Sequence, residues 1–461
     1  MRNEFTADTI AAIATPIGRG GIGIVRISGT GASTIAYAIT DRSIDSELKP
    51  RHAHLVHIND DNGQIIDQAL LLYMPGPHSY TGEDVVELSC HGGPIILTRV
   101  LDRVLAAGAQ PARAGEFTLR AFLSGRIDLA QAEAVADLVA APTPEGVSVA
   151  ANQLAGRLSD AVHNMRRACV DLLAQMEAEV DFDEDDVPAM DRETIGTLLD
   201  QLDRQLSTVL ESSKRGIMQR HGLRVALIGS PNVGKSSLLN ALLSTDRAIV
   251  TNVPGTTRDV LEESFNLDGV PIVLNDTAGL RDTQDPVEDI GVARTKQALE
   301  ISDVAILVID SSRPLLQTDL NAASRIRATD KPTIVALNKR DLPQGIHRRD
   351  IARLLPNATV VHTSALVDDI EELRNAIRAT TGIAFESGGD LVLVASIRHE
   401  DALRRTREEL AGARRAVANS EPSDFISIGV RGAVNTLGEI TGESATEDLL
   451  DAIFSKFCIG K

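Results

Sequence analysis

LRVALIGSPNVGKSSLLNALL, residues 223–243, connects a strand-like apolar run to a helix-like segment through a glycine turn. The turn has the spacing G-x-x-x-x-G-K-S from Gly229 to Ser236. In such a turn, backbone amides and the start of the following helix point at phosphate groups, the lysine reaches the outer phosphates, and the hydroxyl binds Mg²⁺. We therefore expect Lys235 and Ser236 to take these two roles in an α/β domain.

The segments that follow this turn predict the fold of the whole domain. Between residues 221 and 382, helical segments alternate with five apolar, strand-like runs: LRVALI, PIVLN, VAILVID, TIVALN and ATVVHT. This alternation is typical of a mostly parallel sheet wrapped by helices. The sequence therefore predicts a phosphate-loop domain of the α/β class at 221–382.

A second motif, NDTAGL at 275–280, ends the run PIVLN. Asp276 stands where a carboxylate can hold Mg²⁺ through a water, and Gly279 leaves room for a backbone amide near the terminal phosphate. Many nucleotide hydrolases carry a water-orienting glutamine after this turn, but here the residue is Leu280. Leucine can neither accept a proton nor fix a water, so hydrolysis has to rely on another group.

A third motif, NKRD at 338–341, ends the run TIVALN and predicts the base that is bound. The Asp341 carboxylate can accept hydrogen bonds from the ring N–H and the amino group of guanine, whereas adenine offers an acceptor at that ring position. Lys339 can lay its stem along the base. The later TSAL, residues 363–366, can supply a backbone amide to the guanine carbonyl. GTP is therefore the expected ligand.

The segment GTTRD, residues 255–259, lies between the phosphate loop and NDTAGL, where related hydrolases carry a mobile switch. Thr257 is the candidate for a second protein ligand to Mg²⁺. A threonine-rich surface turn is the alternative interpretation of this segment.

Composition limits the remaining functions. The 461 residues contain 46 Lys and Arg against 65 Asp and Glu, a net charge of −19. A chain of this sign repels polyanions unless a basic face or partner intervenes, which argues against nucleic-acid binding by the chain alone. The chain has three scattered cysteines, no secretion or transit signal and no apolar run of about 20 residues. We expect a cytoplasmic protein without a membrane span.

The flanking regions predict two further domains. Residues 1–120 mix short strands with helices, as in an α+β unit. Residues 121–220 carry a long helical stripe from Leu154 to Val180, an acidic break, and a second amphipathic stretch, which suggests an antiparallel helical hairpin. Residues 383–461 return to helix, so the α/β domain is expected to be inserted into a discontinuous helical domain.

Four segments together resemble the tRNA modification GTPase family MnmE, also called TrmE. They are ATPIGRGGIGIVRISG at 14–29, YTGEDVVELSCHGG at 80–93, RAGEFTLRAFLSGRIDLAQAEAVADLV at 113–139 and FCIGK at 457–461. The resemblance covers essentially the whole chain. It implies an amino-terminal domain similar to folate-binding enzymes and a helical domain interrupted by a GTPase domain.

The resemblance also implies how GTP is hydrolysed without the glutamine. Asn232 combined with Leu280 is similar to members that use K⁺, and a cation held by Asn232, Thr251, Val253 and Thr256 would place positive charge beside the phosphates. Glu288 would polarise the attacking water, although a solvated helix start is an alternative, and Arg281 is a further, equally open catalytic candidate beside Lys235. The nucleotide contacts are assigned to Asn232, Val233, Gly234, Lys235, Ser236, Ser237, Thr251, Asn252, Val253, Pro254, Gly255, Thr256, Thr257, Asp276, Thr277, Ala278, Gly279, Asn338, Lys339, Asp341, Ser364, Ala365 and Leu366.

A second ligand site follows from the resemblance, for 5-formyltetrahydrofolate or a related tetrahydrofolate. Its positions match Arg26, Glu87, Arg126 and Lys461. A carboxylate can accept two donors from a pterin edge, and basic side chains can meet the carboxylates of the ligand. For Arg26 and Glu87 alone, a structural ion pair is the alternative. The role of Cys458 stays open, because a terminal cysteine can simply pack.

The resemblance implies a function in tRNA modification. A homodimer, joined through its amino-terminal domains, would work with the flavin-containing protein MnmG (GidA) in a heterotetramer-type complex. The complex would modify the wobble uridine of certain tRNAs at its fifth ring carbon, with tRNA bound mostly by the partner. Two alternatives stay open: a GTP-switched ribosome-assembly or membrane factor, and a folate-dependent transferase that acts on a small molecule.

Overall fold

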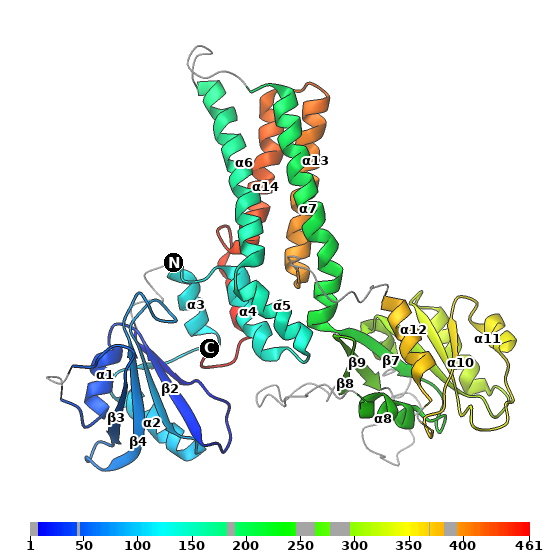
Figure 1. Cartoon of the computed structure of the whole chain (residues 1–461), viewed down its shortest axis with the longest axis horizontal. Coiled ribbons are helices and arrows are strands. Elements are labelled where there is room, and N and C mark those ends of the chain that lie inside the picture. Colours follow the sequence, from blue (N-terminus) through cyan, green and yellow to red (C-terminus); the bar gives the residue numbers. More distant parts are fainter. Residues whose placement is uncertain are drawn as a thin grey trace.

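The computed structural model describes residues 8–43, 47–181, 190–245, 263–276, 296–367, 369–381 and 394–461. Figure 1 shows two α/β parts at the foot of a stalk of long helices. The first α/β part comes from the start of the chain, and the second is inserted between helices of the stalk. The expected multidomain architecture of α/β and α parts is confirmed.

The first α/β part is a mixed six-stranded sheet in the order β3-β4-β5-β2-β1-β6. Its strands pair antiparallel except β1 with β6. Two helices cover one face, where their buried residues share a core with the strands. The elements are β1 Ile10–Ile13, β2 Ile22–Ser28, α1 Ala32–Ile39, β3 Ala53–Asn59, β4 Ile65–Met74, β5 Val85–His91, α2 Pro94–Ala106 and β6 Gln110–Pro111.

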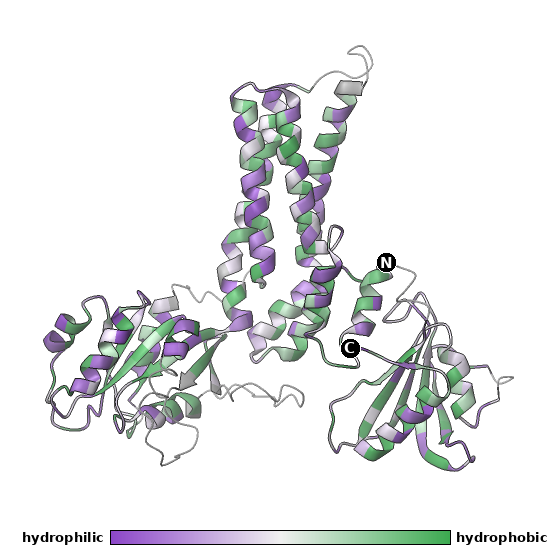
Figure 2. Ribbon diagram, turned by 180° about the vertical axis from the view of Figure 1, so that it is seen from behind, coloured by the Kyte–Doolittle hydropathy of each residue, from purple (hydrophilic) through white to green (hydrophobic). Residues whose placement is uncertain are grey.

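In the described part of the chain the stalk consists of four long helices, and shorter helices lie at its base (Figure 1). Figure 2 shows apolar residues along the inner sides of the long helices, and these residues form one core. The long helices are α6 Arg157–Asp181, α7 Arg192–His221, α13 Ile397–Ala418 and α14 Ser423–Thr441, and the shorter ones are α3 Glu116–Leu123, α4 Leu129–Ala140, α5 Pro144–Leu154 and α15 Glu447–Phe454.

Two expectations about the stalk need correction. The helix expected from Leu154 begins at Arg157, because Gly156 adopts a positive φ of 86° that ends α5. The expected hairpin of α6 and α7 does not form a packing unit, since α6 lies along α14, α7 lies along α13, and α6 and α7 meet at few positions. The stripe on α6 is nevertheless buried, from Leu158 to Met176.

The second α/β part has a six-stranded sheet in the order β12-β11-β10-β7-β9-β8, parallel except for β8. Helices α8 and α12 share a core with one face, and α10 and α11 share a core with the other. This confirms the predicted mostly parallel sheet wrapped by helices. The elements are β7 Leu223–Ile228, α8 Lys235–Thr245, β8 Glu263–Leu267, β9 Val270–Asp276, β10 Val304–Asp310, α10 Gln317–Arg327, β11 Thr333–Asn338, α11 Arg348–Leu354, β12 Thr359–His362 and α12 Glu371–Thr381.

The chain crosses twice between the stalk and the second α/β part, and Arg220 holds both crossings. Arg220, in the last turn of α7, donates from Nη1 to the carbonyl oxygen of Ala395 at 3.2 Å. Its Nη2 forms an ion pair with Oδ1 of Asp137 on α4 at 2.6 Å. Burial raises the pKa of Asp137 to about 6, although the nearby Arg220 guanidinium opposes this shift.

Glu133, one turn before Asp137 on α4, holds the start of α13. Arg398 donates to both oxygens of the Glu133 carboxylate at 3.0 Å, and Nε2 of His399 lies 2.7 Å from Oε2. Burial alone would raise the pKa of Glu133, but the hydrogen bond from His399 and the Arg398 guanidinium lower it to about 2. The carboxylate is therefore ionised at neutral pH and binds two consecutive residues at the second crossing.

None of the helices that the structure describes combines the length and the apolar composition needed to cross a membrane.

Replacing Glu133 with alanine leaves the Arg398 guanidinium without its carboxylate. Because removing one member of a buried ion pair costs about 3–5 kcal/mol, we expect a clearly lower thermal unfolding midpoint, followed by circular dichroism. The matched control is Glu400→Ala, which removes a half-buried carboxylate of α13. Its partner, the exposed Arg404, lies 2.7 Å away on the same helix α13, so the change should cost at most about 0.5 kcal/mol. Equal losses in the two variants would contradict the structural role of Glu133.

Candidate functional site

The glycine turn lies between β7 and α8, as its spacing predicts. Two of its residues adopt positive φ angles, Asn232 at 63° and Gly234 at 95°. A Cβ atom on Gly234 would lie 2.3 Å from Nδ2 of Asn338, so a larger residue there would collide with the strand end beside it. Ser236 and Ser237 are exposed in the first turn of α8. The turn therefore has the shape and the helix start that a phosphate ligand needs.

The ammonium group of Lys235 lies over the turn itself. Its Nζ donates to the carbonyl oxygens of Gly229 and Ser230, each at 2.8 Å. The side chain is buried, so the charge is held close to the loop. From this position Lys235 can meet the outer phosphates of a nucleotide.

Asn338 connects the phosphate loop to the segment 363–366. Its side chain is buried and donates from Nδ2 to the carbonyl oxygen of Val233 at 2.9 Å. Its Oδ1 accepts from the backbone amide of Ala365 at 3.3 Å and from the Thr363 hydroxyl at 3.4 Å. The sequence placed Asn338 among the nucleotide contacts, but in the structure its amide joins three loops to each other.

Lys339 and Asp341, two of the three charged residues of NKRD, have defined partners as well. Lys339, at a positive φ of 65°, donates from Nζ to the carbonyl oxygen of Asn232 at 3.2 Å and to Oδ2 of Asp310 at 2.7 Å. The Ser364 hydroxyl donates to Oδ1 of Asp341 and so orients the carboxylate that is expected to read guanine. Leu366 is 85% exposed at the end of the same segment.

Asp310 is a site residue that sequence reasoning missed. It ends β10 and pairs in register with Asn338 at the end of the parallel strand β11. Burial acts to raise its pKa, but hydrogen bonds from Lys339 and Ser312 hold the pKa below its ordinary value. The signal was present in the sequence, because an aspartate that ends one parallel strand lies beside the residues that end the next.

The structure describes only part of the predicted switch and magnesium-binding residues. Among those described, Asp276 ends β9 beside β7, in register with Leu227. In the described residues, no group of three or more His, Cys, Asp and Glu side chains could hold a metal ion. The predicted residues outside the described ranges are Thr251, Asn252, Val253, Pro254, Gly255, Thr256, Thr257, Thr277, Ala278, Gly279, Arg281 and Glu288.

A second cluster surrounds Arg26 in the first α/β part. Arg26 and Glu87 face each other on β2 and β5, and Nε donates to Oε1 at 2.8 Å. The guanidinium carbon lies 5.5 Å from the centroids of both the Tyr80 and the Phe117 rings. The structural ion pair between Arg26 and Glu87, the alternative interpretation of these two residues, is therefore present, and the rings of Tyr80 and Phe117 lie next to the Arg26 guanidinium.

The carboxyl-terminal tail lies against this cluster. Arg26 donates from Nη1 to the carbonyl oxygen of Gly460 at 3.3 Å, and Ile459 forms a β-bridge with Ala114. Burial lowers the pKa of Lys461, and the charge of Arg26 adds to this effect, while Cys458 acts in the opposite direction. Cys458 itself is exposed.

Three of the four predicted folate residues are thus close together, namely Arg26, Glu87 and Lys461. Arg126 lies in the exposed turn between α3 and α4, where its backbone amide donates to Ala121. Among the described residues, no side-chain contact joins Arg126 to the other three.

A phosphate loop between strand and helix, in contact with an NKRD sequence at the end of another strand of the same sheet, defines a P-loop GTPase domain. Comparison with known proteins identifies the family. The family model described as the MnmE helical domain matches residues 129–458, and the model described as the GTP-binding protein TrmE N-terminus matches residues 9–126. This chain belongs to the MnmE (TrmE) family of tRNA modification GTPases.

Full-length relatives named tRNA modification GTPase MnmE agree with this assignment. The relative from Alkaliphilus metalliredigens is 45% identical over 99% of this chain and 100% of its own length. The relative from Chloroflexus aurantiacus is 46% identical over 98% of this chain and 100% of its own length. Among solved structures, the G domain of the T. maritima FeoB iron transporter is 34% identical, covers 34% of this chain and 98% of that chain, and has a TM-score of 0.27. The protein is a GTP hydrolase in tRNA modification.

Replacing Gly234 with alanine adds a methyl group in a left-handed backbone conformation and against Asn338. We expect the affinity for a fluorescent GDP analogue, measured by titration, to fall at least about tenfold, which corresponds to about 1.4 kcal/mol. Gly63→Ala is the matched control, because Gly63 also has a positive φ of 76° but has nothing within 4 Å of the added atom. An unchanged affinity of the Gly234 variant would contradict this prediction.

Proposed function

We propose that this GTPase, together with the flavin-containing partner MnmG (GidA), forms the aminomethyl-type modification at C5 of the wobble uridine of certain tRNAs. The one-carbon unit comes from a tetrahydrofolate, and GTP hydrolysis depends on K⁺ and Mg²⁺. The protein acts in the cytoplasm. The observation that carries the proposal is the contact of the Arg26 cluster with the carboxyl-terminal tail, because it brings distant basic, acidic and aromatic groups together.

The chemistry of this cluster suits a tetrahydrofolate. Glu87 is held through Oε1 by Arg26, which leaves its carboxylate oriented to accept N–H donors from a pterin edge. The rings of Tyr80 and Phe117 offer apolar faces beside it. Lys461 supplies positive charge for the carboxylates of the ligand, and Arg126 is a second candidate for this role. A bound 5-formyltetrahydrofolate or a related compound would supply the one-carbon unit.

The phosphate loop suits a K⁺-dependent mechanism. The backbone carbonyl of Asn232 is engaged by Lys339, so the loop is held while the Asn232 side chain stays exposed at its surface. An amide oxygen at this point can bind a monovalent cation beside the phosphates. The further ligands in this proposal are Thr251, Val253 and Thr256, and Ser236 and Thr257 hold Mg²⁺. Glu288 polarises the attacking water, with Lys235 and Arg281 as further catalytic residues.

An exposed apolar face on the first sheet supports a homodimer through the amino-terminal part. Leu55 on β3 and Leu70 on β4 are direct cross-strand partners, and their residues are 61% and 47% exposed. Ile65, at the start of β4, is 62% exposed. Contiguous exposed apolar surface marks protein contacts, and we take the Leu55–Leu70 pair as part of such a surface.

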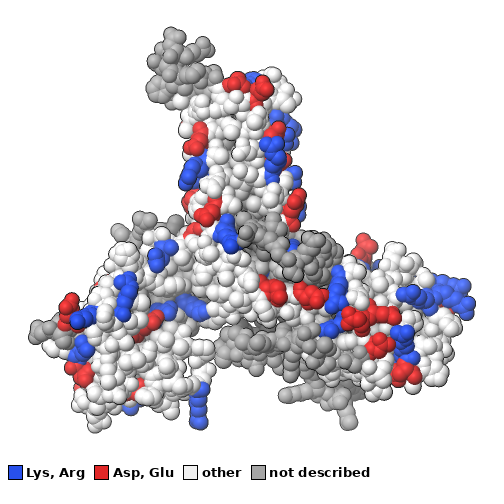
Figure 3. Space-filling view, in the orientation of Figure 1, with Lys and Arg blue, Asp and Glu red and all other residues white. Residues whose placement is uncertain are grey.

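The charges on the stalk support tRNA binding through the complex rather than by this chain alone. Figure 3 shows Asp and Glu side chains beside Lys and Arg along the helices. Many of the arginines are paired, for example Arg414 with Asp200 at 2.6 Å and Arg431 with Glu177 at 2.8 Å. Paired charges attract phosphates weakly, so the partner has to supply most of the RNA-binding surface.

Nucleoside analysis of tRNA tests the modification. In cells that lack this chain, we expect the wobble uridines to lose the modification, and the intact chain should restore it. Arg26→Ala should fail to restore it but keep GTP hydrolysis, because Arg26 orients Glu87 and contacts the tail in a part of the chain separate from the phosphate loop.

The control for this experiment is Arg99→Ala, which removes an exposed arginine of the same part of the chain, 3.6 Å from Asp60, and should restore the modification fully. If the wobble uridines still carry the modification in cells without the chain, the proposed modification is refuted and a GTP-switched assembly factor is favoured.

The K⁺ requirement is tested by replacing K⁺ with Na⁺ in a GTP turnover assay. We expect the turnover to fall at least about tenfold, because the proposed site has to hold K⁺, which is larger and less strongly hydrated than Na⁺. Asn232→Ala should be slow in both salts, whereas Asn321→Ala, on the exposed side of α10, should respond to K⁺ like the intact chain. Equal turnover of the intact chain in K⁺ and Na⁺ would rule out a K⁺ mechanism.

A further inference from the structure

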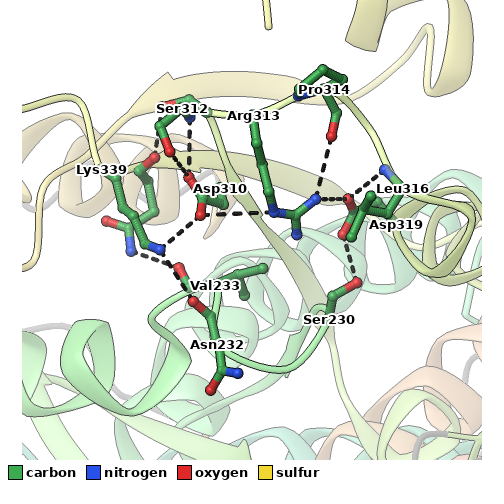
Figure 4. A network of polar contacts seen from close by, with 12 residues as sticks. Ser230, Asn232, Val233, Asp310, Ser312, Arg313, Pro314, Leu316, Asp319 and Lys339 are labelled. Carbon is green, nitrogen blue, oxygen red and sulfur yellow. Dashed lines mark hydrogen bonds and ion pairs between the residues drawn. The ribbon is translucent and has the colours of Figure 1, made fainter. Parts of the chain in front are cut away.

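A series of polar contacts runs from the phosphate loop through the segment 310–319 and back to the phosphate loop (Figure 4). Its two middle members are Arg313, after β10, and Asp319, in the first turn of α10. We propose that Arg313 and Asp319 are positioning residues. Through them, the affinity of the phosphate loop for the nucleotide depends on the position of Lys339, the lysine expected to lie along the base.

The first contact is on the phosphate side. The Ser230 hydroxyl donates to Oδ1 of Asp319 at 2.6 Å, and the carbonyl oxygen of the same serine accepts from Nζ of Lys235 at 2.8 Å. A shift of Ser230 therefore moves an acceptor of the phosphate-binding lysine. Asp319 is 1% exposed, so its carboxylate has little access to water that could replace this bond.

The middle contacts lead away from the loop. Oδ2 of Asp319 accepts from the backbone amide of Leu316 at 2.9 Å and from Nη1 of Arg313 at 3.1 Å. On its other side, Nε of Arg313 lies 3.8 Å from Oδ2 of Asp310. At this distance Arg313 and Asp310 form no hydrogen bond and attract each other only through their opposite charges. This is therefore the weakest contact of the series.

The final contacts are on the base side. Nζ of Lys339 lies 2.7 Å from Oδ2 of Asp310, the oxygen that Arg313 approaches, and also donates to the carbonyl oxygen of Asn232 at 3.2 Å. Ser230 and Asn232 are two residues apart in the phosphate loop. The series is therefore closed, and it joins both sides of the nucleotide site through Asp319, Arg313 and Asp310, none of which is among the predicted nucleotide contacts.

Helix capping does not account for the whole arrangement. Oδ2 of Asp319 caps α10 through the amide of Leu316, which needs only this one oxygen. The other oxygen, Oδ1, is aimed at Ser230. Because a buried carboxylate is costly unless each oxygen finds a donor, loss of either contact destabilises the other. The cap and the phosphate loop are thus tied to one carboxylate.

The expected consequence is an energetic coupling between Ser230 and Lys339, measured with a fluorescent GDP analogue. Ser230→Ala and Lys339→Met are made singly and together, and the dissociation constants are compared as a double-mutant cycle. We expect the two effects to be non-additive by at least about threefold. In the background of Arg313→Met the same cycle should be additive, because the connection is broken while the cap on α10 is kept.

Asp310→Asn replaces Lys339→Met in the cycle if the lysine variant binds GDP too weakly to measure. Thermal unfolding of every variant confirms that it is folded, and Asn321→Ala on α10 is the control that should leave GDP binding unchanged. A role in folding alone would lower the unfolding midpoint but leave the cycle additive. Additive effects in the intact background, or equal coupling with and without Arg313, would overturn the proposal.

Discussion

Two carboxylates on α4, the buried Glu133 and the half-buried Asp137, are the constraint on which the arrangement of the chain depends. Asp137 binds Arg220 where the chain leaves the stalk, and Glu133 binds Arg398 and His399 where it returns. Moving such charges out of water costs several kcal/mol per ion, and only well-placed partners offset this cost. Because their partners lie in the last turn of α7 and the first turn of α13, these carboxylates fix the two stalk helices between which the second α/β part is inserted.

The contacts of Arg398 also lead toward the second cluster. Arg398 also donates from Nη1 to the carbonyl oxygen of Glu439 on α14 at 2.6 Å. From α14 the chain continues through α15 to the tail, where the carbonyl of Gly460 accepts from Arg26. The helices that flank the inserted domain therefore also lead to the tail that contacts the Arg26 cluster.

Prediction from sequence succeeded where a pattern is local and was limited where it is not. The strand, turn and helix around Lys235 were predicted correctly because the G-x-x-x-x-G-K-S spacing and its neighbours form one continuous unit. The stripe on α6 correctly predicted a buried face, but an amphipathic pattern does not say which helix covers that face. The covering helix, α14, comes from more than 240 residues later, beyond the inserted domain.

The sequence by itself determined the phosphate loop with its flanking strand and helix, and the α/β and helical classes, since each rests on a pattern that is local in the chain. Only the tertiary structure decided that Asn338 would join three loops, that Asp310 and Asp319 would connect the two sides of the nucleotide site, and that Arg26 would meet Gly460, 434 positions away. These contacts depend on strand order and helix docking, which are set by burial over the whole chain, and no local spacing records them.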